Sequence, residues 1–238
     1  MALWSCGLKL SGTLNDIMMI QNITLRRVLP KVFRGSEKES PVCDSEVWMR
    51  DELMFTRPGN YIIEAESGTG KSSLCSFIYG ARTDYDGEIL MDGEPVKGYS
   101  IEKWCRLRRE ALAYLPQEMR LFPELSVMDN IMVKNRLTSY RSEAEILQML
   151  DRLELRHKAE WNAGLLSVGQ QQRVAIIRAL CQPFDFLLVD EPVSHLDARN
   201  NESVAALIVE EAERRSAAVI ATSVGNKLTL NEFRLLHL

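Results

Sequence analysis

The sequence predicts an α/β fold with a mostly parallel sheet, and three observations lead to this prediction. Short apolar strands such as residues 217–223 alternate with amphipathic helices such as residues 202–215, which is the pattern of strands joined by helical crossovers. A glycine-rich loop at residues 65–72 stands between a predicted strand and a predicted helix. The apolar strand at residues 184–192 runs into two adjacent acids, where open α/β sheets place their ligand chemistry.

The first hundred residues carry most of the strand and turn signals. The stretch from Ile20 to Leu29 favours an extended strand, and the polar stretch at residues 34–45 favours a loop. Asp92 and Gly93 separate two strand-like runs, a pattern typical of a hairpin. The other elements expected here are strands at residues 46–55 and 60–67 with a turn at 57–60, and a helix at 71–80.

Residues 100–178 show helical patterns and no convincing strand. Helices are expected at residues 101–112, 126–138 and 142–155, with a further helix at 168–181. Ser142 followed by Glu145 is the signature of a capping box at the third of these. We also expect a final strand at residues 232–238. The predicted division is an N-terminal extension at residues 1–18, a core at residues 19–99 and 179–238, and an inserted helical subdomain at residues 100–178.

Composition and charge restrict the class of protein. The 238 residues carry a net charge of −4 and a pI of about 5.6, so nucleic acid is not expected as a partner. The five cysteines form no C-x-x-C pair, which indicates a reducing compartment. No apolar run approaches the ~20 residues of a membrane helix, and the first residues lack the pattern of a signal peptide. We therefore expect a cytoplasmic protein.

Residues 65–72, AESGTGKS, nearly match the phosphate-loop pattern G-x-x-x-x-G-K-[ST], with Ala65 in place of the first glycine. Such a loop turns backbone N–H groups toward phosphates, and the following helix adds the positive end of its dipole. Lys71 is expected to reach the β- and γ-phosphates of ATP, and Ser72 to hold Mg²⁺. If position 65 needed a left-handed backbone, alanine would cost about 1–2 kcal/mol. The predicted nucleotide contacts are Glu66, Ser67, Gly68, Thr69, Gly70, Lys71, Ser72 and Ser73.

Two acids follow the apolar strand at residues 184–192. Asp190 suits a Mg²⁺ ligand, held directly or through water. Glu191, one residue later, is expected to face the γ-phosphate and to polarise the attacking water as general base. Two exposed acids at a strand end would be unremarkable alone, but here they accompany a phosphate loop.

Three further motifs indicate the family. Residues 166–173, LSVGQQQR, resemble the signature LSGGQ-x-Q-R of ATP-binding cassette (ABC) proteins, and they precede the acid-ended strand as in that family. Gln117 in AYLPQE resembles the family's Q-loop glutamine, and residues 194–197, SHLD, resemble its D-loop. The resemblance covers residues 19–238. The segment from Leu107 to Ile131 looks most like the single-cassette ATPase subunits of lipoprotein-release and macrolide-export transporters.

The resemblance implies the ABC form of the phosphate-loop fold, with an antiparallel β subdomain, and an ATPase that drives a membrane permease on a separate chain. It implies a sandwich dimer of cassettes, either a homodimer or a heterodimer, in which Ser167, Gly169, Gln170 and Asp197 contact ATP held by the other subunit. Gln117 would contact Mg²⁺ and serve catalysis. The chain would lie on the inner face of the cell membrane. The permease is expected to dock at Met119, Leu121 and Phe122, unless these side chains pack the core of the helical insertion.

Besides Ala65, the sequence departs from the family pattern at two further positions. Val168 replaces a signature glycine, and Ser223 occupies the position of the switch histidine that reaches the γ-phosphate. Arg27 and Phe33 are both candidates for stacking on adenine. We expect a slow ATPase.

Other functions stay open at this stage. The leading alternative is a regulatory cassette that binds ATP with slow or no hydrolysis, for example as the weak half of a heterodimer. A soluble ABC protein of DNA repair or translation fits less well. The sequence has neither the long coiled coil of the repair type nor the second cassette of the translation type.

Overall fold

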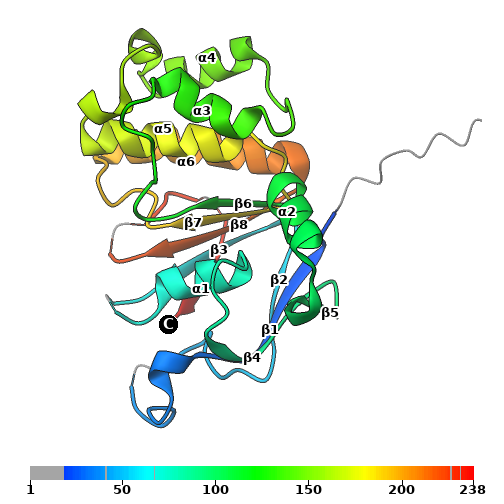
Figure 1. Ribbon diagram of the computed structural model, residues 1–238. Coiled ribbons are helices and arrows are strands. Elements are labelled where there is room, and N and C mark those ends of the chain that lie inside the picture. Colours follow the sequence, from blue (N-terminus) through cyan, green and yellow to red (C-terminus); the bar gives the residue numbers. More distant parts are fainter. Residues whose placement is uncertain (1–18, 41, 67, 226, 231) are drawn as a thin grey trace, which may run out of the picture.

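The computed structural model describes residues 19–40, 42–66, 68–225, 227–230 and 232–238. The predicted extension at residues 1–18 lies outside these ranges. The described chain forms two sheets with helices packed around them (Figure 1). No helix in these ranges is both long enough and apolar enough to cross a membrane.

The larger sheet is parallel, as the alternation of strands and helices predicts. Its strands, in spatial order, are β6 (Leu112–Leu115), β7 (Phe186–Asp190), β8 (Ala218–Ser223), β3 (Gly59–Glu64) and β9 (Arg234–His237). Neighbouring strands run parallel, with Glu64 paired to Ser223 and Asp190 paired to Thr222. The carboxyl ends of β3, β7 and β8 therefore meet at one edge.

The smaller sheet is antiparallel. Its spatial order is β2 (Leu53–Thr56), β1 (Asn22–Pro30), β4 (Tyr85–Met91) and β5 (Glu94–Pro95). The predicted hairpin at Asp92 and Gly93 joins β4 to β5, and both residues have positive φ (50° and 82°). The fold-class prediction is confirmed by this pair of sheets.

The helices begin and end close to their predicted positions. Ser142 caps α4 with Glu145 in a complete capping box, as predicted. The α-helices are α1 (Lys71–Ile78), α2 (Ile101–Glu110), α3 (Val127–Asn135), α4 (Glu143–Arg152), α5 (Val168–Leu180) and α6 (Ala198–Arg215). The short 3-10 helices are η1 (Lys31–Phe33), η2 (Val96–Gly98), η3 (Arg156–Lys158) and η4 (Ala163–Leu165).

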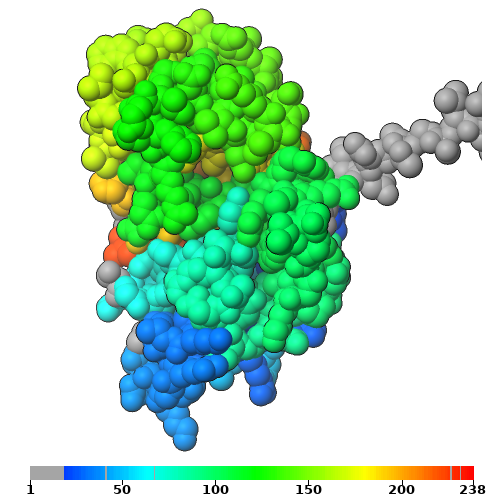
Figure 2. All heavy atoms as spheres, in the orientation of Figure 1, coloured from blue at the N-terminus to red at the C-terminus, as the bar shows by residue number. Residues whose placement is uncertain are grey.

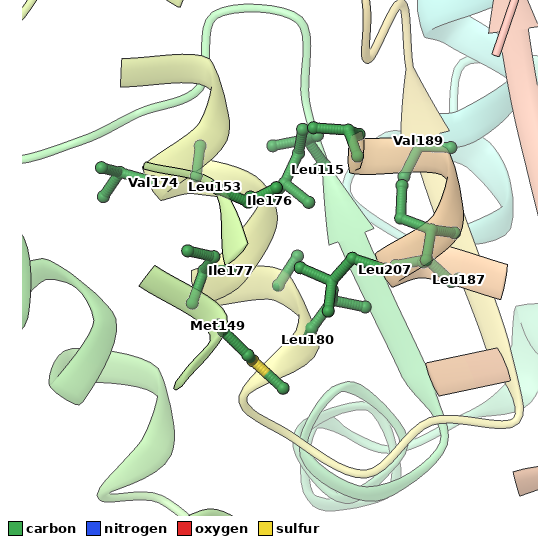
Figure 3. Close-up of a cluster of buried hydrophobic side chains, with 14 of the residues drawn as sticks. Leu115, Met149, Leu153, Val174, Ile176, Ile177, Leu180, Leu187, Val189 and Leu207 are labelled. Carbon is green, nitrogen blue, oxygen red and sulfur yellow. The ribbon is translucent and has the colours of Figure 1, made fainter. Parts of the chain in front are cut away.

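Each face of the parallel sheet buries its own core, because successive side chains of a strand point to opposite faces. Leu187 and Val189 of β7 pack with α3, α4, α5 and α6 on one face (Figure 3). Phe186 and Leu188 pack with α1 and the antiparallel sheet on the other. Figure 2 shows α3, α4 and α5 as a lobe above the layer that holds α1 and α2. The strands thus lie between two buried cores, one on each face of the sheet.

Two expectations about strands are wrong. Residues 100–178 contain β6, which forms the edge of the parallel sheet beside β7. Its four residues LAYL follow α2 almost directly, so the segment carries neither turn residues nor an alternating pattern. The predicted strand at residues 46–55 is a strand only from Leu53, and residues 46–49 form turns that lead Trp48 into the core.

Candidate functional site

The phosphate loop lies between β3 and α1, as predicted. Gly68 and Gly70 have positive φ (87° and 100°), whereas Ala65 does not. Its N–H donates to the carbonyl of Ser223 (3.2 Å) and continues the pairing of β3 with β8. Alanine therefore carries no left-handed strain at position 65, and the missing first glycine does not distort the loop.

Trp48 supports the loop from below, a contact that the sequence did not suggest. Its indole Nε1 donates to the carbonyl of Thr69 (3.1 Å), and the side chain is buried. A Cβ placed on Gly70 would lie 3.1 Å from the Trp48 ring and 3.3 Å from the Phe33 ring. A side chain at position 70 would therefore crowd these two rings, in addition to the strain of its positive φ.

The remaining loop side chains are held within the chain. The Thr69 hydroxyl donates to the carbonyl of Glu66 (2.9 Å). The Ser73 hydroxyl accepts from Arg82 Nη1 (2.9 Å) on the turn after α1. Ser67 lies outside the described residues.

Lys71 lies at the centre of a short chain of polar contacts. Its Nζ donates to the carbonyl of Glu66 (2.8 Å), approaches that of Ala65 (3.4 Å), and lies 3.7 Å from Glu191 Oε1. Gln117 Nε2 donates to the other carboxylate oxygen of Glu191 (3.3 Å). The structure thus brings together three residues that the sequence predicted, from segments far apart along the chain.

Asp190 is buried at the end of β7. Its Oδ1 accepts from the Thr222 hydroxyl (2.6 Å), while Oδ2 is buried without a hydrogen-bond partner. Sequence reasoning missed Thr222, although it directly precedes Ser223 on a strand that ends at the same edge. Ser223 is itself buried.

Glu191 has a positive φ of 51°, an uncommon conformation for a non-glycine residue that costs free energy unless the surroundings hold it. Its N–H donates to the Thr222 hydroxyl (3.2 Å), and its carbonyl accepts from Gln172 Nε2 (3.0 Å). Gln172 also accepts the N–H of His195 through its side-chain oxygen (3.2 Å). Neighbouring segments therefore hold the Glu191 backbone on both sides.

Oxygen ligands at this edge fit a hard cation such as Mg²⁺. Mg²⁺ usually takes one or two protein oxygens together with substrate phosphates. The partnerless Oδ2 of Asp190 offers one, and Ser72, exposed in the first turn of α1, offers a hydroxyl. Within the described ranges no group of three or more His, Cys, Asp or Glu side chains could hold a metal ion by itself. Phosphate oxygens of the nucleotide would supply further ligands.

The signature segment forms the start of α5. Ser167 Oγ accepts from the N–H of Gln170 (3.3 Å), and Gln170 Oε1 accepts from the N–H of Ser167 (3.1 Å), a capping box. Val168 is 49% exposed. A Cβ on Gly169 would lie 2.9 Å from the carbonyl of His195, so glycine is needed there for close packing within the chain.

Asp197 begins α6. Its Oδ1 accepts from the N–H of Asn200 (2.8 Å), and this backbone hydrogen bond is the main cause that lowers the pKa of the carboxyl group. The structure thus gives Asp197 a capping function within its own chain.

The two candidates for stacking on adenine differ in their surroundings. Arg27 is exposed and pairs with Asp51 (2.7 Å). Phe33 in η1 lies against the phosphate loop at Gly70. Phe33 is therefore the candidate adjacent to the nucleotide contacts.

The segment after Gln117 is only partly exposed. Met119 is buried and Leu121 packs against the core, but Phe122 is 48% exposed. Burial in the core, the alternative considered above, thus holds for Met119, whereas Leu121 is only partly buried and Phe122 stays exposed.

Beside this segment lies a cavity of about 230 Å³, lined partly by Tyr79, Tyr114, Arg120, Lys134 and Arg178. Burial, followed by the charges of Arg178 and Arg108, lowers the pKa of Lys134 to about 8. The cavity is a basic groove next to the Q-loop.

Comparison with known proteins agrees with the motifs. A family model described as ABC transporter matches residues 55–194. The chain is 31% identical to the lipoprotein-releasing system ATP-binding protein LolD of Shewanella denitrificans, over 76% of this chain and 79% of that protein. It is 30% identical to LolD of Francisella tularensis subsp. tularensis, over 68% and 72%.

Two solved structures share the fold. The dimeric bacterial ABC transporter cassette MJ0796 has a TM-score of 0.67 at 25% identity, over 84% of this chain and 87% of that chain. A bacterial Atm1-family ABC exporter with ATP bound has a TM-score of 0.67 at 23% identity, over 86% of this chain and 35% of that one. The second likeness concerns the fold alone.

Proposed function

The chain belongs to the ABC transporter family, as an ATP-binding cassette. From that premise we propose that it binds and slowly hydrolyses Mg-ATP between two cassettes and drives a permease carried on a separate chain. The observation that supports this most is the convergence of Lys71, Gln117 and Glu191 beside Asp190 at one edge of the parallel sheet.

ATP would bind over the phosphate loop. The N–H groups of the loop and the N-terminus of α1 would face the phosphates, with Lys71 leaving the carbonyl of Glu66 for the β- and γ-phosphates. Phe33 would stack on adenine, because its ring lies against Gly70. The other predicted contacts, from Glu66 to Ser73, would bind the phosphates through backbone N–H groups of the loop.

Mg²⁺ would be held by Ser72 and Asp190, with Gln117 close by. When bound, the ion neutralises charge on the β- and γ-phosphates. The buried and partnerless Oδ2 of Asp190 supports this assignment, since an unpaired buried carboxylate oxygen is costly unless a ligand or water meets it.

Glu191 would act as general base toward the attacking water. Gln117 would position its carboxylate through the 3.3 Å hydrogen bond. Ser223 would replace the switch histidine with a single short hydroxyl that cannot carry a charge. We therefore propose turnover below the roughly 10 s⁻¹ median of enzymes in general.

The second cassette would close the site. Ser167, Gly169, Gln170 and the N-terminus of α5 would meet the γ-phosphate held by the partner, and Asp197 would lie at the same interface. The exposed side chain of Val168 would leave less space between the start of α5 and the ATP held by the partner cassette. Val168 and Ser223 together favour a second candidate function, a weakly hydrolysing cassette paired with a more active one.

The permease would dock beside the Q-loop, at the basic groove and at the exposed side chain of Phe122. This would place the chain on the inner face of the membrane through its partner. The printed name of the LolD relatives, which are ATP-binding proteins of a lipoprotein-releasing system, supports a transporter of this kind.

The direct test measures ATP binding and phosphate release by the purified chain, with and without Mg²⁺. We expect saturable ATP binding and slow, Mg²⁺-dependent release. Absence of nucleotide binding would refute the proposed function. Binding without any release, alone or with a second cassette, would instead favour the regulatory candidate.

A separate experiment tests the docking surface. Tagged wild type and Phe122→Ser would be recovered from native membranes, with Phe233→Ser, another exposed phenylalanine, as the matched control. We expect only Phe122→Ser to lose the co-purifying membrane protein, while all three chains bind ATP equally. Equal recovery of that protein by all three would contradict docking at Phe122.

A further inference from the structure

We propose that Thr222 is a positioning residue for this reaction. Its hydroxyl aims the free oxygen of Asp190 toward the metal position and holds the backbone of Glu191. The inference rests on the proposed function, because it concerns the same site. It assigns a role to Thr222, a residue that none of the motifs described above names.

The first support is the contact between Thr222 and Asp190. The two residues are paired neighbours in the register of β7 and β8, so their side chains lie on the same face of the sheet. The Thr222 hydroxyl donates to Asp190 Oδ1 at 2.6 Å, and both side chains are buried. A carboxylate with one oxygen held this way cannot rotate without losing a charge-assisted hydrogen bond.

The consequence concerns the other oxygen. Since Oδ1 is engaged, the Asp190 carboxylate presents Oδ2, which has no hydrogen-bond partner. Groups that orient a metal ligand from behind typically raise metal affinity about 10–100-fold. Thr222 stands in that relation to Asp190.

The second support is the contact between Thr222 and Glu191. The same hydroxyl accepts the N–H of Glu191 at 3.2 Å, and Glu191 has a φ of 51°. A left-handed glutamate persists only where its surroundings hold it. A hydroxyl is both donor and acceptor, so one side chain can serve both acids at once.

The side-chain chemistry makes the role specific. Serine would keep both hydrogen bonds. Valine has the shape of threonine but neither donor nor acceptor, and it would leave Asp190 Oδ1 and the Glu191 N–H without this partner. The pair of variants therefore separates the hydroxyl from simple packing.

The experiment measures the affinity for ATP twice for each variant, once with Mg²⁺ and once with EDTA. The ratio of the two dissociation constants reports how strongly the site uses the metal. We expect Thr222→Val to reduce that ratio about tenfold or more, with less than about a twofold change in EDTA. Thr222→Ser should stay close to wild type.

Two controls accompany the titration. Thr24→Val changes another buried strand threonine, in the antiparallel sheet, and should leave the ratio unchanged. Mn²⁺ binding in the presence of ADP, followed by electron paramagnetic resonance, should weaken in Thr222→Val and not in Thr24→Val. This readout does not depend on turnover.

Several outcomes would overturn the inference. Equal weakening of ATP binding by Thr222→Val with and without Mg²⁺ would mean that the residue only packs the sheet. If the ratio of dissociation constants is unchanged in Thr222→Val, or falls in Thr222→Ser as far as expected for valine, the hydroxyl does not position Asp190 for the metal. If Thr222→Val does not fold, Thr222→Ala takes its place, and an unchanged ratio and Mn²⁺ signal in that variant would overturn the inference. Wild type that binds no nucleotide in either buffer would overturn the proposed function itself.

Discussion

The phosphate loop and the start of α5 are both expected to meet ATP, but the chain holds them in different ways. The loop is tied to distant segments, through Trp48 below it and Ser223 beside it. The start of α5 is capped by its own next turn, where Ser167 and Gln170 satisfy each other, and Val168 faces outward. The loop is thus a site prepared within one chain, whereas the start of α5 is a surface prepared for contact. A single chain should therefore bind nucleotide and need a second one for efficient chemistry.

Glu191→Gln gives the largest expected effect. It tests whether nucleotide binding and hydrolysis can be separated, as the comparison of the loop with α5 predicts. The amide keeps the shape and removes the base, and a positioned proton-transfer group contributes typically about 10²–10⁴-fold. Phosphate release should fall by at least about 10²-fold while ATP still binds.

The same variant tests the contact surface at α5. Gel filtration with saturating Mg-ATP should show a shift from monomer to dimer. A variant that remains monomeric would mean that Val168 prevents the sandwich or that the partner is a different cassette.

Lys71→Ala tests whether the phosphate loop of a single chain binds nucleotide by itself. The lysine lies at the convergence of the loop carbonyls and Glu191, so its loss should weaken ATP binding by at least tenfold, about 1.4 kcal/mol. Isothermal titration against wild type measures this. Equal affinities of wild type and variant would mean that Lys71 does not bind the phosphates of ATP.

Ser223→His tests hydrolysis separately from cassette contact. It changes a side chain beside the proposed γ-phosphate position and leaves the surface at the start of α5 unchanged. An imidazole that reaches the γ-phosphate adds a hydrogen bond to a charged group, worth about 1.5 kcal/mol or more. Turnover should rise roughly tenfold.

Ser223→Ala is the matched control and should lower turnover below wild type. Steady-state phosphate release, with and without the permease, gives the answer. A histidine variant that is no faster in either setting would show that Ser223 is not the missing switch.

Trp48→Phe has the smallest expected effect. The phenyl ring keeps much of the packing against Gly70 but removes the donor to the carbonyl of Thr69. The free energy of unfolding should fall by about 1 kcal/mol, a drop in Tm of about 2–4 °C. Thermal melting without nucleotide measures this. Trp161→Phe, at a 47% exposed position, should leave Tm unchanged, and an equal drop in both variants would contradict a specific brace.

Much of the fold could be predicted because its signals are local. The capping box at Ser142, the turn at Asp92 and Gly93, and the apolar strand before Asp190 each depend on residues close in sequence. β6 could not be predicted, because four apolar residues directly after a helix look the same in a strand and in a helix end.

The site was predictable where a motif named the residue and not where a tertiary contact did. Lys71, Gln117 and Glu191 belong to motifs, and the structure brings them together. Trp48 and Thr222 act through hydrogen bonds to residues 21 and 32 positions away, and neither stands in a pattern that marks such a contact. Met119 was expected on the surface, but tertiary packing buries it.

The position of Trp48 also gives the molecule an optical property. Its indole is buried and donates to the carbonyl of Thr69, whereas Trp161 is 47% exposed. A buried indole emits at shorter wavelength than a hydrated one, and its emission responds to changes in the nearby backbone dipoles. A triphosphate bound over the loop, as proposed, would change the dipoles around the Thr69 carbonyl that the indole contacts. Excitation of the unlabelled protein should therefore report nucleotide arrival directly, as a change in the blue part of its fluorescence spectrum.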